Sequence, residues 1–231
     1  MIIGGYVKNS FVDYPQNISA VIFTVGCNMN CWYCHNKNLI TMSEKIKGQQ
    51  KKLKTEIFDF LRNHRCFLDA VVISGGEPTL QNDLFEFIIA IKSMGYKVKL
   101  DTNGTNPDCI HKLIKNKLVD YIAMDIKAPL NKYNTITETN NNLKDIEKSI
   151  KLIMDSLIDY EFRTTFAPPL TVDELVQIAQ IITGANNYCI QKYRPCNDLD
   201  NITEILPIKS TMLQAQLKCC KFVKQCNLRG F

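Results

Sequence analysis

Six short runs of apolar and β-branched residues recur along the chain, with segments of helical periodicity between them. The runs cover residues 18–25, 70–74, 96–102, 121–126, 160–166 and 188–193. Runs of this length and composition are typical of buried strands. Strands that alternate with helices predict a parallel sheet with right-handed crossovers and outer helices. We therefore expect an α/β fold, either an open sheet or a curved partial barrel, with its functional site at the carboxyl ends of the strands.

The spacing of apolar residues between these runs predicts helices. The expected helices cover residues 55–65, 84–95, 107–116, 141–156, 171–184 and 209–226. Thr171 and Glu174 have the spacing of a capping box, which marks a helix start. We expect a single domain, and its parts are a lead-in segment at 1–17, a core of six βα units at 18–193, and a C-terminal loop and helix at 194–231.

The composition argues against several classes of protein. The 231 residues carry a net charge of +5 and are 45% hydrophobic, which is ordinary for a globular protein. The lysines are scattered, so we expect a solvated surface and no nucleic-acid site; the alternative is a shallow attraction for an acidic partner or nucleotide. No apolar run approaches the ~18 residues of a membrane span, and the start lacks a signal peptide. We expect no membrane association and a cytoplasmic location, where the ten cysteines should not be counted as disulfides.

Three cysteines, Cys27, Cys31 and Cys34, follow the first predicted strand in a C-x3-C-x2-C arrangement. Thiolates so close in sequence can converge on one centre, and soft sulfur ligands select zinc or iron–sulfur. A closed zinc site needs a fourth ligand, and the nearest candidate, His35, is adjacent to Cys34, so both would rarely reach one ion. Zinc and unligated thiols remain alternatives. A [4Fe–4S] cluster with one open iron accounts for the missing fourth ligand. Cys196 has no assigned role.

The pattern C-x3-C-x-aromatic-C, with Tyr33 as its aromatic residue, resembles the signature of radical S-adenosylmethionine (SAM) enzymes. The resemblance implies a partial (βα)6 barrel of parallel strands with outer helices. It also implies that the open iron binds the amino and carboxylate groups of SAM, and that Tyr33 belongs to the cofactor-binding residues. In such enzymes the reduced cluster splits SAM into methionine and a 5′-deoxyadenosyl radical.

The segment SGGEP follows the second predicted strand and contains Gly75, Gly76 and Glu77. Glycines let a backbone approach a ligand closely, and a glutamate can accept hydrogen bonds from an ammonium group. A plain turn between strand and helix is the alternative. Downstream of the cysteine motif, the segment resembles the GGE element of the family, which implies contact with the amino group of SAM.

Two more polar segments end the third and fourth predicted strands: DTNG, with Asp101, Thr102 and Asn103, and MDIK, with Asp125 and Lys127. Residues two apart on a strand point to the same face, and buried charges need partners. The zwitterionic methionine end of SAM supplies both charges, and the resemblance implies that these five residues bind it. Relatives among glycyl-radical activating enzymes also suggest a monovalent cation at Asp101, Thr102 and Asp125.

Further residues are assigned to the cofactor by the resemblance alone. His35 and Asn36 match a pair near the adenine and ribose of SAM, and the alternative is an ordinary loop. Arg163, at the end of the fifth predicted strand, could reach the carboxylate or ribose, or be a surface arginine. Some relatives use a late-strand histidine, for which this chain could offer only Gln191 or Arg194.

Residues 9–36 resemble the start of activating enzymes for glycyl-radical proteins, most closely that of anaerobic ribonucleoside-triphosphate reductase. The resemblance implies abstraction of hydrogen from a glycine of that protein, with flavodoxin or ferredoxin as electron donor. Asp13 matches an aspartate near the incoming glycine loop, although a turn explains it equally well. The alternatives are an activase of pyruvate formate-lyase or another glycyl-radical enzyme, a small-molecule enzyme such as 7-carboxy-7-deazaguanine synthase, and an electron carrier.

Overall fold

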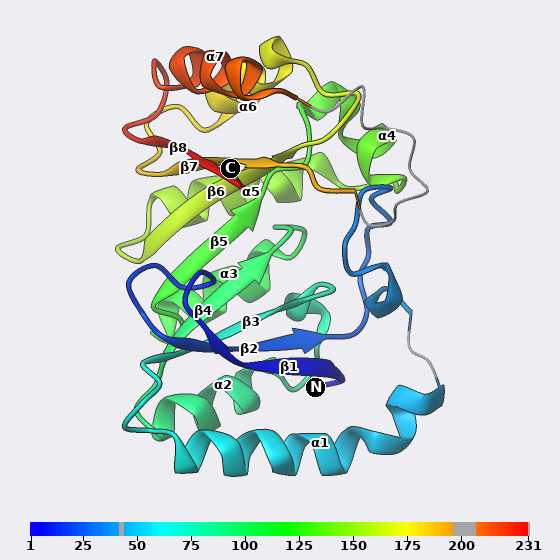
Figure 1. The fold of residues 1–231 in the computed structure, drawn as a ribbon, viewed down its shortest axis with the longest axis vertical. Coiled ribbons are helices and arrows are strands. Elements are labelled where there is room, and N and C mark those ends of the chain that lie inside the picture. Colours follow the sequence, from blue (N-terminus) through cyan, green and yellow to red (C-terminus); the bar gives the residue numbers. More distant parts are fainter. Residues whose placement is uncertain (42–43, 196–206, 231) are drawn as a thin grey trace.

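A computed structural model describes residues 1–41, 44–195 and 207–230, and its centre is one eight-stranded sheet in the order β1 to β8 (Figure 1). Strand β1 is antiparallel to β2, and all later neighbours are parallel. The strands are β1 (Ile3–Ser10), β2 (Ser19–Thr24), β3 (Ala70–Gly75), β4 (Lys97–Thr102), β5 (Tyr121–Asp125), β6 (Asp159–Phe166), β7 (Tyr188–Lys192) and β8 (Cys226–Arg229).

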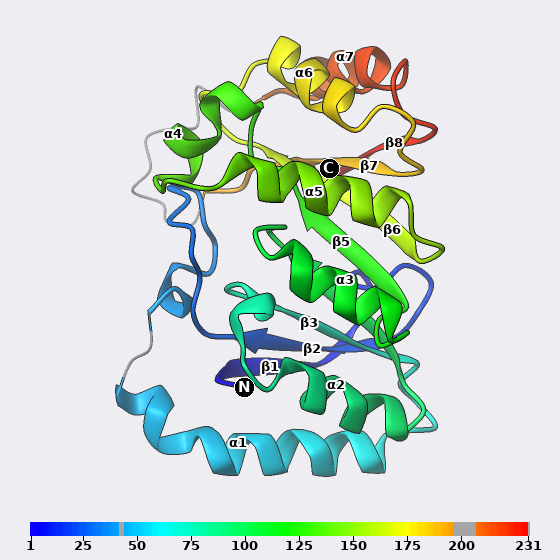
Figure 2. The ribbon, with the colours of Figure 1, turned by 180° about the vertical axis from the view of Figure 1, so that it is seen from behind.

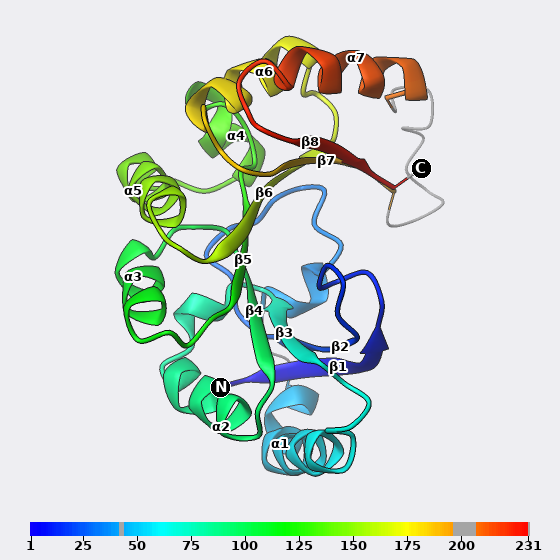
Figure 3. The same ribbon diagram turned by 90° about the vertical axis from the view of Figure 1, so that its left-hand side faces the viewer.

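Helices cover the convex side of the curved sheet, whereas the segment after β2 crosses its concave side (Figure 3). The helices are α1 (Glu44–Asn63), α2 (Leu84–Ser93), α3 (Pro107–Lys115), α4 (Tyr133–Thr137), α5 (Leu143–Met154), α6 (Val172–Ile181) and α7 (Lys209–Cys219). Seen from behind, α1, α2, α3 and α5 follow one another across the sheet (Figure 2). The edges β1 and β8 do not pair with each other. The α/β class, the parallel core and the partial barrel are therefore confirmed.

The six predicted strands are present as β2 to β7, but the sheet has one more strand at each edge. Strand β1 was not predicted, because its two glycines and its exposed residues give no apolar alternation. The helix prediction over residues 209–226 was wrong at its end: α7 stops at Cys219, and Cys226 begins the four-residue strand β8. The cysteines and lysines of this segment lie at helical spacing, so nothing in the sequence indicated the turn between α7 and β8. Cys196 lies outside the described residues.

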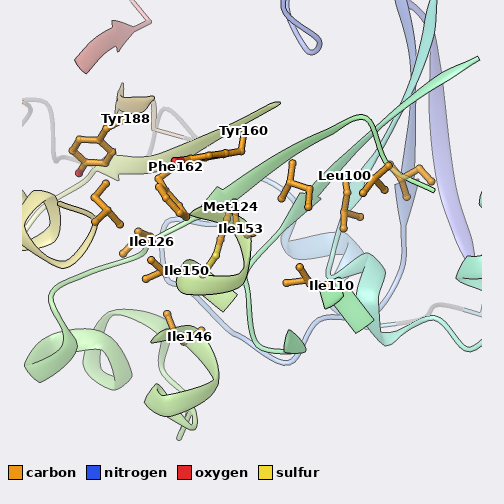
Figure 4. Packing of buried hydrophobic residues seen from close by; sticks show 14 of the residues in the cluster. Leu100, Ile110, Met124, Ile126, Ile146, Ile150, Ile153, Tyr160, Phe162 and Tyr188 are labelled. Atoms are coloured by element: carbon orange, nitrogen blue, oxygen red, sulfur yellow. The ribbon is translucent and has the colours of Figure 1, made fainter. Parts of the chain in front are cut away.

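Apolar residues on the convex side of the sheet pack against the helices. Leu100, Met124 and Phe162, from three neighbouring strands, meet Ile110 of α3 and Ile150 of α5 (Figure 4). None of these five side chains is more than 4% exposed. Burial of each such side chain stabilises the fold by about 1.5–3 kcal/mol, so this layer fixes the strands in place.

The concave side is layered differently. At its floor, Tyr14 from the loop between β1 and β2 packs on Tyr121, with ring centroids 5.5 Å apart. Val21, Ala70 and Val72 complete this second, small apolar cluster together with Ala123. Polar side chains follow above it, toward the carboxyl ends of the strands. Within the described ranges, none of the helices combines the length and apolar character needed to cross a bilayer.

Candidate functional site

A cavity of about 690 Å³ lies at the carboxyl ends of the parallel strands. Fourteen of the fifteen residues predicted as the site line it: Cys27, Cys31, Tyr33, Cys34, His35, Asn36, Gly75, Gly76, Asp101, Thr102, Asn103, Asp125, Lys127 and Arg163. Its wall also includes Asp13, Gln191 and Arg194, and it extends to Arg229 and Gly230 at the end of β8. The cavity therefore brings together residues from all parts of the sheet.

The cysteine loop is held by main-chain hydrogen bonds. The Gly26 amide donates to the Leu39 carbonyl (2.7 Å), and the Cys34 amide donates to the Cys31 carbonyl (3.0 Å). These bonds close the loop into a compact unit that places three thiols against one cavity. Cys31 is buried, whereas Cys27 and Cys34 are half-buried.

Burial affects the acidity of two of these thiols. It raises the pKa of Cys27 to about 11 and also raises the pKa of Cys31, so both thiols are protonated at neutral pH when no metal is present. Binding of iron by these two thiols would therefore displace their protons. Among the described residues, no three His, Cys, Asp or Glu side chains are grouped closely enough to hold a single metal ion.

Close backbone contact joins the glycine segment after β3 to the cysteine loop. The Gly76 amide donates to the Thr24 carbonyl (2.9 Å), and the Glu77 amide donates to the Gly26 carbonyl (2.8 Å). A Cβ atom on Gly76 would lie 2.1 Å from the Gly26 carbonyl oxygen, and Gly75 has a φ of +109°. Only glycine fits at both positions, so the two loops are locked together by their main chains.

Glu77 is the predicted site residue that does not line the cavity. Its side chain is fully buried, and one carboxylate oxygen accepts from the Thr79 amide and hydroxyl and from the Thr102 hydroxyl (2.8 Å). The other oxygen accepts from the Asn103 amide (2.6 Å). Burial raises the pKa of Glu77, and these hydrogen bonds oppose the rise. Glu77 therefore ties the loops after β3 and β4 together beneath the cavity, and its direct contact with SAM stays a prediction.

A ladder of alternating charges crosses β4, β5 and β6. Asp101 accepts from Arg163 (3.3 Å), and Arg163 also donates to Asp125 (2.8 Å). Asp125 in turn accepts from Lys127 (3.0 Å). The register explains the order, because Asp125 stands opposite Arg163 in the parallel pairing of β5 with β6. Lys99, two residues before Asp101, adds a further cation at 2.7 Å.

The ladder shifts the acidity of its members. Burial alone would raise the pKa of Asp101, but Arg163 and Lys99 outweigh it and hold that pKa below its ordinary value. In the same way, burial opposes the effect of Arg163 and Lys127 on Asp125, whose pKa nevertheless lies far below its ordinary value. Asp101 and Asp125 are therefore both ionised at neutral pH.

Other predicted residues surround this ladder. Asn36 donates to the Gly75 carbonyl (3.4 Å), and Asn103 donates to the Asn28 side chain (2.9 Å), so both fix loops at the cavity. The His35 ring lies 6.3 Å from the Tyr193 ring. The Tyr33 hydroxyl is buried, and it has no hydrogen-bond partner among the described residues.

Sequence reasoning missed two members of the polar layer. Lys99 is 1% exposed and pairs with Asp101, and Ser74 donates to the same aspartate (3.0 Å). The signal for Lys99 was present, because it precedes Asp101 by two residues and so shares its face of the strand. From sequence alone, Lys99 is indistinguishable from a surface lysine. The structure shows that its face of β4 is the buried, concave side.

The residues fit an iron–sulfur cluster and a charged, amino-acid-like ligand. The three thiols face one cavity, and beside them lie three cations and two carboxylates, which leaves a surplus of one positive charge. The orphan Tyr33 hydroxyl offers an unused hydrogen-bonding group. When bound, the cluster supplies the electron that cleaves SAM, while Lys127 and Arg163 present positive charge to an anionic group.

Comparisons with known proteins agree with this geometry. The profile of the Radical SAM superfamily matches residues 21–182. The chain is 40% identical over 213 residues to a protein of Methanocaldococcus jannaschii whose name proposes a glycyl-radical enzyme activating enzyme, and the match covers 90% of this chain and 86% of that protein. It is 34% identical over 126 residues to the pyruvate formate-lyase-activating enzyme of Listeria monocytogenes, which is 50% of this chain and 49% of that enzyme.

Among solved structures, that of TYW1 with a lysine-pyruvate adduct bound shares the fold, with a TM-score of 0.61 and 14% sequence identity. The alignment covers 88% of this chain and 73% of TYW1. The family profile spans most of the chain, including the cysteine loop, the glycine segment and the charge ladder. The chain therefore belongs to the radical SAM superfamily, whose enzymes use a [4Fe–4S] cluster and S-adenosylmethionine.

Proposed function

We propose that this radical SAM enzyme activates a glycyl-radical enzyme by removing a hydrogen atom from one glycine of that protein. The observation that carries the proposal is the 40% identity to the Methanocaldococcus protein along nearly the whole length of both chains. Glycine suits such a reaction because it has no side chain to bar close approach to the cavity.

The rim of the cavity supports a protein substrate. Val12 and Asp13, in the loop between β1 and β2, line the cavity, and Arg229 and Gly230 line it from β8. Phe11 and Val12 are 70% and 78% exposed. Exposed apolar side chains beside a charged cavity form a surface that a polypeptide segment can contact.

Within this proposal, each part of the site has a separate role. Cys27, Cys31 and Cys34 hold the cluster, while Lys127 and Arg163 orient SAM by its carboxylate. The apolar floor around Tyr14 closes the amino-terminal side of the barrel and limits entry of dissolved hydrogen donors such as thiols, which would quench a carbon radical.

The specific partner proposed is anaerobic ribonucleoside-triphosphate reductase, on the strength of residues 9–36. The proposed electron donor is flavodoxin or ferredoxin, and the proposed location is the cytoplasm. The similarity to the Listeria enzyme gives pyruvate formate-lyase as the second candidate partner.

The test is anaerobic reconstitution with iron and sulfide, followed by mixing with dithionite, SAM and each candidate partner in turn. We expect a doublet in the electron paramagnetic resonance spectrum of the reductase. A signal with pyruvate formate-lyase alone would replace the partner and keep the activity. Cleavage of SAM with turnover of a purified metabolite, and no signal with either protein, would refute the proposed function.

A matched pair of variants tests the rim. Phe11→Asp should reduce the glycyl-radical yield by roughly tenfold or more, as expected for loss of an apolar interface contact, with SAM cleavage in the absence of partner unchanged. The control is Phe67→Asp, because Phe67 is also exposed (50%) but has no chain neighbour in the cavity lining, whereas Phe11 adjoins Val12, which lines the cavity. Equal effects of the two substitutions would contradict a partner contact at the rim.

A further inference from the structure

Strand β4 places a lysine inside the barrel. The Lys99 side chain is 1% exposed, and its neighbours in the sheet register are Val72 and Tyr121, which belong to the apolar floor. Its ammonium nitrogen lies 5.7 Å from the centroid of the Tyr121 ring. A buried lysine is unfavourable unless it is paired, and its partner here is Asp101 at 2.7 Å.

The charge ladder has a cation on every carboxylate oxygen. Lys99 donates to Oδ1 of Asp101, and Arg163 donates to Oδ2 of Asp101 and Oδ1 of Asp125. Lys127 donates to Oδ2 of Asp125. A metal cation that bound Asp101 at Oδ1 would lie against the Lys99 ammonium, and two like charges at such a distance in a buried site repel strongly.

We propose that Lys99 is a built-in counter-ion that positions Asp101, in place of a monovalent metal cation. The inference goes beyond the proposed function, because it applies whichever partner the enzyme activates. It replaces the expectation from sequence that Asp101, Thr102 and Asp125 hold a monovalent cation.

The lysine also sets the charge of the cavity wall. Lys127 and Arg163 line the cavity, whereas Lys99 lies beneath it. Lys99 balances the charge of Asp101, and Lys127 balances that of Asp125. The positive charge of Arg163 therefore remains unbalanced. With Lys99 the ladder has a surplus of one positive charge, and without it the ladder is neutral. The surplus favours a ligand with an anionic group, such as the carboxylate of SAM.

The test compares the full chain with Lys99→Ala and with Lys92→Ala as a matched control. Lys92 pairs with Asp120 at 2.8 Å, but neither residue lines the cavity. Each protein is measured in potassium, sodium, ammonium or tetramethylammonium chloride at one ionic strength. The readouts are the thermal midpoint of the cluster-free protein and the SAM dissociation constant of the reconstituted protein.

We expect the wild-type protein to show the same midpoint and dissociation constant in all four salts. Lys99→Ala should lower the midpoint and raise the dissociation constant at least tenfold in tetramethylammonium, because Asp101 then keeps only one of its two cations and a buried carboxylate with an unsatisfied oxygen is costly. Small cations should restore the midpoint and bring the dissociation constant to within about threefold of the wild-type value, since they fit the space that the side chain left. Lys92→Ala should show no such selectivity.

Two outcomes would overturn the proposal. The first is a wild-type protein whose SAM affinity requires potassium or sodium. The second is a folded Lys99→Ala protein that responds equally to all four salts. Should Lys99→Ala not fold, Lys99→Met and Lys99→Arg decide instead: the methionine variant should gain the selectivity and the arginine variant should not. None of these measurements involves a partner protein, so their failure is distinct from failure of the proposed activity.

Discussion

The side chains of the cavity take their positions from alternation along single strands. On β4, Leu100 points to the helices, whereas Lys99 and Asp101 point to the concave side. On β6, Phe162 and Arg163 divide in the same way. The same short runs therefore build both the apolar core and the charged site, and a shift of one residue would exchange the two.

Cysteines inside and outside the cavity lining should respond differently to substitution by alanine. Cys31→Ala should abolish iron incorporation and SAM cleavage, because it removes one of the three proposed cluster ligands. Cys226→Ala should leave both intact, since Cys226 begins β8 and does not line the cavity. Iron content and methionine release after anaerobic reconstitution measure the difference. Unimpaired cleavage by the Cys31 variant would refute the cluster assignment.

The Tyr33 hydroxyl provides a second test at a single residue. It is buried without a partner among the described residues, which costs about 1–3 kcal/mol. Tyr33→Phe should therefore raise the free energy of unfolding of the cluster-free protein by roughly 1 kcal/mol. The same substitution should weaken SAM binding, because a bound ligand is expected to use the hydroxyl. Chemical denaturation and equilibrium dialysis check both effects, and unchanged SAM affinity would limit the tyrosine to packing.

Strands β4, β5 and β6 act together as a charged element, and this element predicts a pH dependence. The pKa values of Asp101 and Asp125 lie below the ordinary 3.8 in the folded protein. Their stabilisation is therefore complete above about pH 4 and is lost as the pH falls through the folded-state values. The free energy of unfolding should decrease in that range by at most about 1.4 kcal/mol per pH unit for each carboxyl. Denaturation of the cluster-free protein, repeated as the pH is lowered from neutral, measures this slope.

Asp125→Asn gives the comparison for this pH dependence. It removes one of the two titrating carboxyls, so the acid-side slope should become shallower. An unchanged slope would mean that other groups dominate acid unfolding.

Much of the element order could be predicted from sequence, and the misses have physical causes. The strands β2 to β7 are buried on both faces and carry strong apolar runs. Edge strands need only one partner, so β1 could include glycines and β8 could be four residues long. Neither pattern distinguishes a strand from a loop.

For the candidate site, the residues that line the cavity could be predicted, but the directions of some side chains could not. The residues of the cysteine, DTNG and MDIK segments were found because each motif follows a strand. The local role of Glu77 was not, because the direction of a side chain in a turn depends on donors from a distant loop, here Thr102 and Asn103. The pairing of Lys99 was hidden for the same reason.

At the scale of the whole molecule, the cavity connects segments that are distant in sequence. Binding of SAM to the reconstituted protein should therefore slow amide hydrogen exchange at residues 26–36, 74–77, 101–104 and 125–127. At a hundred times the dissociation constant, the added stability is about 2.7 kcal/mol, which slows exchange by global opening about a hundredfold. Mass spectrometry with and without SAM measures the change.

Helix α7 provides the internal reference for this exchange experiment. It packs on the outer side of the sheet, and its residues do not line the cavity. The local openings of α7 should be unaffected by SAM. Protection confined to α7, with none at the strand ends, would contradict the placement of the cofactor.

The contact between Gly26 and Gly76 has a consequence for how such enzymes diversify. At this contact the main chains of the two loops meet directly, and no side chain intervenes between Gly26 and Gly76. Mutations elsewhere around the chamber can then alter which molecule is admitted without displacing the inorganic centre. Selectivity can therefore change at the rim while the loop that carries the three cysteines keeps its place against the end of β3.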